Sequence, residues 1–317
     1  MIDLLTVVSR SLGLCEGLPI WLGYSGGVDS RVLLDVLLQL GESPGLIHVN
    51  HGFHREAGLW EKSAEELAEK YALKFRVKRL GGKVPRGESL EAFARTERLE
   101  FFSEVIGTGR ILLGHQAEDQ AETLLLQLLR GAGPRGLSGM GKEKPLGQGR
   151  ILRPLLHVSR EEILDYAKKR QLTWIEDDSN QNERFKRNVL RHQVLPILKQ
   201  HFPGYLKTLD RSARCCALEH KVLSLWGAEK LGELTDALEE RFYFKRDLFK
   251  DAPIEIQRQL LRLWLEKKLP RPLNERHLQE IEKLMHAEHW PEAFFQLGKL
   301  RMAREKESLI LLRQNFG

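Results

Sequence analysis

The sequence has no hydrophobic run long enough to cross a membrane, because no stretch of about eighteen residues is wholly apolar. Residues 1 to 20 also lack the basic start and the apolar core of a signal peptide. We therefore expect a chain that is neither secreted nor membrane-spanning and that works in the cytoplasm. Its 317 residues, of which 42% are hydrophobic and 30% charged, suit a globular protein of about two domains.

Cysteine is scarce as well. The chain contains Cys15, Cys215 and Cys216, and the adjacent pair lacks the CxxC spacing of zinc and redox sites. This odd set argues against a disulfide framework and predicts buried or unreactive thiols in a reducing compartment. The motif GxxxxGK[ST] is also absent, so any nucleotide site in this chain is not the common P-loop.

Acidic residues are nearly missing from one long segment. Fifty Lys and Arg against forty-four Asp and Glu leave a formal charge of +6, and the pI is about 9.1. From residue 184 to residue 214, however, eight basic residues accompany one acid, Asp210. A solvated helix face is the usual alternative for such a run, but the near absence of acids favours contact with a phosphate backbone.

Short apolar runs alternate with segments of helical period over the first two thirds of the chain. This alternation predicts an α/β domain over residues 1–214, with a parallel sheet and helices on both faces. Residues 215–317 are expected to form a smaller, mainly helical domain that ends in a β-hairpin. The glycine-rich segment 131–149 is interpreted as a long functional or mobile loop. The expected strands are 20–24, 45–49, 74–79, 110–114 and 172–175, and the expected helices of the first domain are 30–40, 58–71, 89–106, 117–130 and 159–170.

The stretch SGGVDS joins the first expected strand to the first expected helix of the sheet. Free N–H groups and the helix dipole favour an anion at such a helix start, and Gly26 and Gly27 allow its close approach. Ser25 and Ser30 add hydroxyl donors. Asp29 would repel a bare phosphate, so two alternatives are open: it holds a divalent cation against a nucleotide, or it caps the helix.

Three further clusters follow expected strands or lie beside them. His115, Asp119 and Glu122 are spaced by four and three, which puts all three on one helical face near the start of the expected helix. Two carboxylates there suit a cationic ligand, such as an amino acid's ammonium group, or a metal; a polar first turn is the simpler alternative. Arg95 and Arg98 could clamp phosphate. The segment HVNHGFHREAG offers nucleotide or nucleic-acid contacts, whereas zinc is poorly supported.

Taken in order, six motifs resemble the tRNA(Ile)-lysidine synthetase family of PP-loop ATP pyrophosphatases. The motifs are SGGVDS, HVNHG, EAFARTERLEFF, GHQAEDQAETLLLQLLRGAGPRGLSGM, ILRPLLHVSREEI and WIEDDSNQNERFKRNVLRHQVLPIL. The resemblance implies an adenine-nucleotide-hydrolase-like fold and an ATP-dependent ligation. C2 of the wobble cytidine, position 34 of a CAU-anticodon tRNA(Ile), would be adenylated and then attacked by the ε-amine of free lysine. The product would read AUA and be charged with isoleucine.

The resemblance also assigns residues. ATP would be bound by Ser25, Gly26, Gly27, Val28, Asp29 and Ser30, and Asp29 would also hold Mg²⁺. The catalytic residues would be Asp29, Arg95, His115, Asp119 and Glu122, of which Asp119 and Glu122 would bind lysine. The tRNA would be bound by Arg153, Arg187, Asn188 and Arg191. Family members often have a second histidine where this chain has Gln116. Another PP-loop enzyme or a non-catalytic tRNA binder are the alternatives. No membrane partner is expected, and the oligomeric state is open, a homodimer included.

Overall fold

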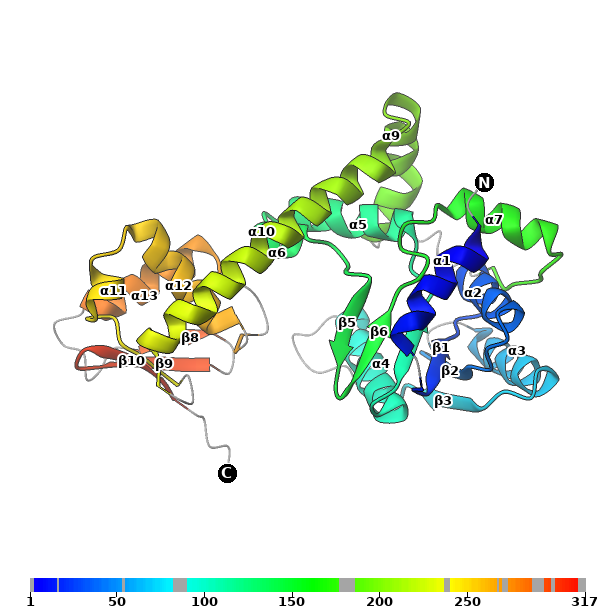
Figure 1. Cartoon of the computed structure of the whole chain (residues 1–317), viewed down its shortest axis with the longest axis horizontal. Coiled ribbons are helices and arrows are strands. Elements are labelled where there is room, and N and C mark those ends of the chain that lie inside the picture. The colour runs from blue at the N-terminus through cyan, green and yellow to red at the C-terminus, as the bar shows by residue number, and fades with distance from the viewer. Residues whose placement is uncertain are drawn as a thin grey trace. The chain divides into compact units, whose positions relative to one another are not determined.

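The computed structural model describes residues 3–15, 17–52, 55–81, 90–176, 186–236, 240–266, 268–269, 273–286, 294–297 and 300–312. The chain divides into two compact units, Met1–Ala217 and Leu218–Gly317. Figure 1 shows the elements of both units. Among the described residues, no helix combines the length and the apolar character that crossing a bilayer requires.

A six-stranded sheet forms the centre of the first unit. Its strands, in spatial order, are β3 (Phe75–Arg79), β2 (Gly45–Asn50), β1 (Ile20–Gly23), β4 (Arg110–Leu113), β6 (Gly149–Leu152) and β5 (Glu143–Leu146). The first five run parallel, and β5 pairs antiparallel with β6 at the edge. From β1 the chain proceeds to β2 and β3 on one side, and β4 pairs with β1 on the other. The topological switch point, where ligands bind in such sheets, therefore lies between β1 and β4.

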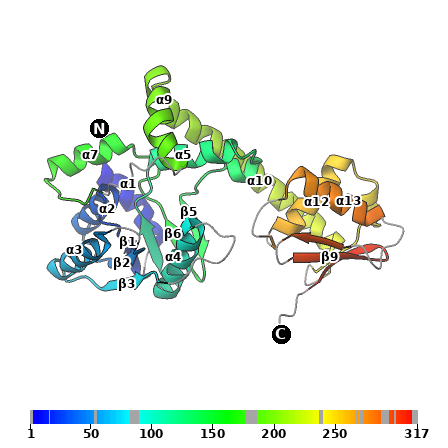
Figure 2. The ribbon, with the colours of Figure 1, turned by 180° about the vertical axis from the view of Figure 1, so that it is seen from behind.

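Helices cover both faces of this sheet, as the alternation predicts. Successive strand residues point to opposite faces, so Leu22, Leu46, Leu112 and Leu152 share a core with α1 (Leu4–Leu12), α2 (Val28–Gln39), α3 (Ala57–Lys70) and α7 (Arg160–Lys169). Ile47, Ile111 and Ile151 pack on the other face against α4 (Leu90–Ile106). Figure 2 gives the reverse view of this unit. The buried strands are apolar on both faces, as parallel sheets require.

A third, small core lies beside the sheet. Ala121 of α5 (Ala117–Leu128) packs with Leu195 of α9 (Leu195–His201) and Tyr205 of α10 (Tyr205–Leu234). Between the sheet and α9 the chain forms α8 (Lys186–Val189) and a π-helical turn, η3 (Leu190–Val194). Both α8 and η3 contact α5. Side chains from the basic segment, the acid-poor residues 184–214, therefore reach the start of α5.

The second unit has its own core and its own sheet. It contains α11 (Asp247–Lys250), α12 (Ile254–Glu266), α13 (Glu275–His286) and an antiparallel sheet in the order β7 (Arg241–Phe242), β10 (Ser308–Leu312), β9 (Leu300–Glu305) and β8 (Phe294–Leu297). The Trp264 ring is 1% exposed and lies 5.0 Å from the ring of Phe242. The expected terminal hairpin is thus part of a four-stranded sheet.

Two expectations for the first unit are wrong. Residues 172–175 form no strand; Leu172 and Trp174 are apolar because they pack on the core of α2 and α7, and Ile175 N–H donates to Gly26 O at 3.0 Å. Segment 131–149 is not a structureless loop, because it holds α6 (Pro134–Leu137) and β5. As an exposed edge strand, β5 does not need apolar residues and tolerates Pro145.

Candidate active site

The turn between β1 and α2 is shaped by its glycines and serines. Gly26 has φ +88°, and a Cβ there would come within 2.8 Å of Ile175 Cδ1. Ser30 Oγ donates to Gly27 O at 3.0 Å, and Ser25 N–H donates to Ser30 Oγ at 3.3 Å. These bonds fix the backbone at the start of a twelve-residue helix, where N–H groups and the dipole attract an anion.

Asp29 sits in the first turn of α2 without capping it. Gly27 occupies the N-cap position, and no side-chain hydrogen bond caps this helix, so the helix-cap alternative is wrong. Within the described residues, Asp29 Oδ1 is buried without a hydrogen-bond partner, and Oδ2 lies 3.9 Å from Arg160 Nη1. Burial, and then the nearby Asp119 carboxylate, raise the pKa of Asp29 to about 7. Within the described residues, one oxygen of Asp29 thus has no partner, while the other faces Arg160.

A pocket opens beside this turn, at the switch point of the sheet. It has a volume of about 230 Å³. Its apolar walls come from the ends of β1, β2 and β4 and from α4, namely Tyr24, Ile47, Val49, Phe102 and Leu113. Its polar side chains are Ser25, Asp29, Ser30, His51, Arg98, His115 and Asp119. A flat apolar base and a polyanion can thus be bound side by side.

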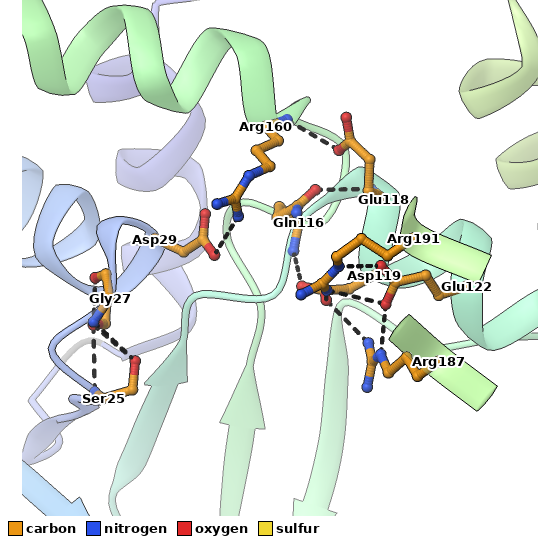
Figure 3. A network of polar contacts seen from close by, with 11 residues as sticks. Ser25, Gly27, Asp29, Gln116, Glu118, Asp119, Glu122, Arg160, Arg187 and Arg191 are labelled. Atoms are coloured by element: carbon orange, nitrogen blue, oxygen red, sulfur yellow. Dashed lines mark hydrogen bonds and ion pairs between the residues drawn. The ribbon is translucent and has the colours of Figure 1, made fainter. Parts of the chain in front are cut away.

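Next to the pocket, two acids of α5 meet two arginines of the basic segment. Glu122 is 0% exposed and accepts hydrogen bonds from Arg187 Nε and, at 2.7 Å, from Arg191 Nε. Asp119 Oδ1 accepts from the Nη2 atoms of Arg187 and Arg191 at 3.0 and 3.1 Å (Figure 3). The residues predicted for lysine and two of those predicted for tRNA therefore form a single ion cluster. Asn188, between the arginines in sequence, is buried.

His115 precedes α5 and is not part of its face, because the helix begins at Ala117. It lines the same pocket as Asp119. Burial lowers the pKa of His115 to about 4, which outweighs the opposite effect of Asp119, and Arg153 and Arg98 lower it further. The imidazole is therefore neutral at pH 7, and it can orient a substrate but is a weak base.

Gln116 has a structural role at this helix start. Its Oε1 accepts from Glu118 N–H at 2.7 Å, while Asp119 Oδ2 accepts from Gln116 N–H at 3.0 Å. This capping box fixes Asp119 with one oxygen and leaves the other for the arginines. Gln116 thus anchors Asp119 at the start of the helix.

The predicted arginine pair of α4 is divided by the structure. Arg98 lines the pocket, whereas Arg95 is exposed and lies outside the pocket lining. Arg153, predicted to bind tRNA, follows β6, is 5% exposed and donates from Nη1 to Gly141 O at 2.8 Å. Arg98 was predicted with Arg95 to clamp phosphate, and it is the member of the pair that lines the pocket.

The histidine-rich segment after β2 is divided in the same way. His51 lines the pocket. His48 Nδ1 lies 2.9 Å from Tyr24 O, and Asn50 Nδ2 donates to Glu61 Oε2 at 2.8 Å, so both brace the fold. His54 lies outside the described residues. In the described parts of the chain, no group of three or more His, Cys, Asp or Glu side chains could hold a metal ion.

Two family models match the sequence. A PP-loop domain model matches residues 12–198, and a TilS substrate binding domain model matches residues 244–310. The tRNA(Ile)-lysidine synthase of Francisella tularensis is 38% identical over 263 residues, covering 82% of this chain and 65% of the relative. The tRNA(Ile)-lysidine synthase of Yersinia pseudotuberculosis is 40% identical over 273 residues, covering 79% and 60%. The chain thus matches less than two thirds of the length of either relative.

One solved structure shares the fold. The U34-tRNA thiolase NcsA from Methanococcus maripaludis, with its [4Fe-4S] cluster, superposes with a TM-score of 0.58 over 68% of this chain and 79% of that chain. Sequence identity is 20%, so the likeness concerns the arrangement of helices and strands alone.

Proposed function

We propose, on the premise that the chain belongs to the PP-loop family, that it ligates free lysine to C2 of the wobble cytidine of a CAU-anticodon tRNA(Ile). One observation carries the proposal: the PP-loop turn and Asp119 of α5 meet at one pocket, which Ser25, Asp29, Ser30, His115 and Asp119 line together. An activated nucleotide and an amine could therefore meet there. The matches to named lysidine synthases and to the TilS substrate binding domain support the choice of substrate.

ATP would bind at the turn 25–30 with its base against the apolar walls of the pocket. The N–H groups at the start of α2 and the hydroxyls of Ser25 and Ser30 would hold its phosphates. The unpartnered Oδ1 of Asp29 fits Mg²⁺, which protein sites typically bind through one or two carboxylates together with substrate phosphates. When bound, Mg²⁺ would neutralise charge on the phosphates.

Lysine would bind at Asp119 and Glu122, where the arginines now lie. An ammonium group is a point charge with three donors, so it could take over contacts that Arg187 or Arg191 make. Both acids already hold cations beside the pocket. His115, neutral at pH 7, would orient the amine or the base.

The chemistry would proceed in two steps. The O2 atom of cytidine attacks the α-phosphorus of ATP, the bond to the β-phosphate oxygen breaks, and pyrophosphate leaves. The neutral ε-amine of lysine then attacks C2, and the C2–O bond breaks to release AMP. The proton lost by the amine passes to a neighbouring carboxylate or to solvent. Adenylation is needed because a carbonyl oxygen is a poor leaving group.

The tRNA would contact exposed basic residues of the first unit together with the second unit. Lys207, Arg211 and Arg214 are exposed on α10, and the family match of residues 244–310 is to a substrate-binding domain. Arg187 and Arg191 are assigned instead to the acidic cluster. Binding through these contacts should weaken as salt rises.

The test is an incubation of the full chain with ATP, labelled lysine and tRNA transcripts. We expect lysine to enter the CAU-anticodon isoleucine tRNA, with one AMP and one pyrophosphate released per lysine joined. Omitting lysine should leave pyrophosphate release limited to the adenylation step. Label entering methionine tRNA equally well would contradict the specificity, and release of ADP and phosphate would contradict the reaction.

A further inference from the structure

Arg153 is a buried cation that has no acidic partner among the residues that the structure describes. It is 5% exposed, and within the described residues its guanidinium makes one hydrogen bond, from Nη1 to Gly141 O at 2.8 Å, while Nε is buried and unpartnered. Burying a charge is costly unless a counter-charge or several hydrogen bonds compensate. A buried arginine of this kind needs an anion that the described side chains do not supply.

Two more cations lie around it. The Arg153 N–H donates to Lys142 O at 2.7 Å, which ties the end of β6 to the start of β5, and α4 packs against β5. Lys144 of β5 and Arg95 of α4 are both exposed. Glu143, the neighbour of Lys144, pairs with Arg150 at 3.4 Å, and successive strand residues point to opposite faces. The acid of β5 therefore does not share the face of Lys144.

The electrostatics agree with this arrangement. Burial and then Arg95 lower the pKa of Arg153 to about 10, so it stays charged at pH 7. Burial, and then Arg95, Arg153 and Arg135, lower the pKa of Lys144. These cations repel one another, and an anion bound among them would remove that cost.

We propose that Arg95, Lys144 and Arg153 form a binding subsite for a backbone phosphate of the RNA substrate, next to the nucleotide that reacts in the pocket. Arg153 forms the floor of the subsite, and the exposed Lys144 and Arg95 contact the phosphate. The inference rests on the proposed function in that the polyanion is tRNA.

The position of the subsite favours RNA over ATP. The PP-loop turn follows β1, whereas Arg153 follows β6, two strands further along the sheet, or about 10 Å at the usual strand spacing. His115, at the end of the intervening β4, is affected by the charge of Arg153. A phosphodiester that flanks a base in the pocket would reach this exposed edge.

The experiment uses full-length Lys144→Gln, because an exposed side chain can be changed without disturbing the core. Affinity for an unmodified CAU-anticodon tRNA transcript is measured over a range of salt concentrations, and affinity for ATP is measured separately. We expect binding of tRNA about fivefold weaker, and a salt slope smaller by about 0.7, the value for one lost phosphate contact with single-stranded nucleic acid. Affinity for ATP should not change.

Two further variants control for the loss of charge. Lys144→Arg should restore tRNA binding, and Lys62→Gln, which removes an exposed lysine of α3, should leave it near that of the unmodified chain. The inference is overturned if Lys144→Gln binds tRNA as tightly as Lys62→Gln does, or if it weakens the binding of ATP and not the binding of tRNA. Lysine incorporation by the unmodified chain is scored separately, so failure of the proposed function would be recognised independently of the subsite.

Discussion

Replacing Asp29 by asparagine should stabilise the folded chain at alkaline pH while removing its activity. The carboxyl group is buried beside Asp119, and its pKa is raised from 3.8 to about 7. A group with a raised folded pKa contributes stability that is complete below its unfolded pKa and is lost as the pH rises through the folded pKa. Asp29 therefore destabilises the fold progressively between pH 3.8 and about 7.

The size of the effect follows from the pKa. Each pKa unit corresponds to about 1.36 kcal/mol. The shift from 3.8 to about 7 thus costs roughly 4 kcal/mol once Asp29 is ionised. About 2 to 3 kcal/mol of that cost should appear between pH 5 and pH 8. Asparagine keeps the shape and loses the charge, so the advantage of Asp29→Asn over the unmodified chain should grow over this range.

The assay is urea unfolding at several pH values. Asp35→Asn is the matched control, since it makes the same change on the same helix but loses the charge that pairs with Arg170 at 3.1 Å. It should destabilise the chain at pH 8, whereas Asp29→Asn should stabilise it. A difference between Asp29→Asn and the unmodified chain that is absent at pH 8, or independent of pH, would refute the reasoning.

Three other experiments test other parts of the structure. Glu122→Gln should cost about 2 kcal/mol of folding free energy, a value discounted for the partial exposure of its two arginine partners, and it should raise the KM for lysine. Glu100→Gln, at an exposed position, should do neither. Equal effects of the two substitutions would contradict the role assigned to the acid–arginine cluster. By NMR, His115 should titrate with a midpoint near pH 4. Its contribution to the stability of the fold is then complete above pH 6.5 and is lost as the pH falls through about 4. A titration midpoint near 6.5 would be inconsistent with the burial of His115. Trp264→Ala should destabilise the second unit by about 3 to 5 kcal/mol in urea unfolding, and a loss under about 1 kcal/mol would mean that its core repacks.

Local patterns predicted the turn between β1 and α2 well. The apolar run 20–24, the two glycines and the following helical period placed the turn at the end of a central strand, and β1, β2, β3 and β4 formed where expected. These features depend on neighbouring residues and on strand periodicity, which a sequence displays directly.

The acid–arginine cluster of Asp119, Glu122, Arg187 and Arg191 could not be predicted from such local patterns. Glu122 is separated by 65 residues from Arg187 and by 69 from Arg191, and only the packing of α8 and η3 on α5 brings them together. Similarly, β5 is exposed and carries a proline, so its pairing with β6 at the sheet edge has no hydrophobic signature. The sequence also could not show that Asp29 does not cap the helix, because this follows from the position of Gly27 at the N-cap.

The most direct test of the central claim is nucleoside analysis by mass spectrometry of CAU-anticodon tRNA(Ile) after incubation with the full chain, ATP and lysine. We predict lysidine at the wobble position, and we predict that Asp29→Asn forms none although that variant is folded. Unmodified cytidine at this position, in the presence of folded chain and both small substrates, would contradict it.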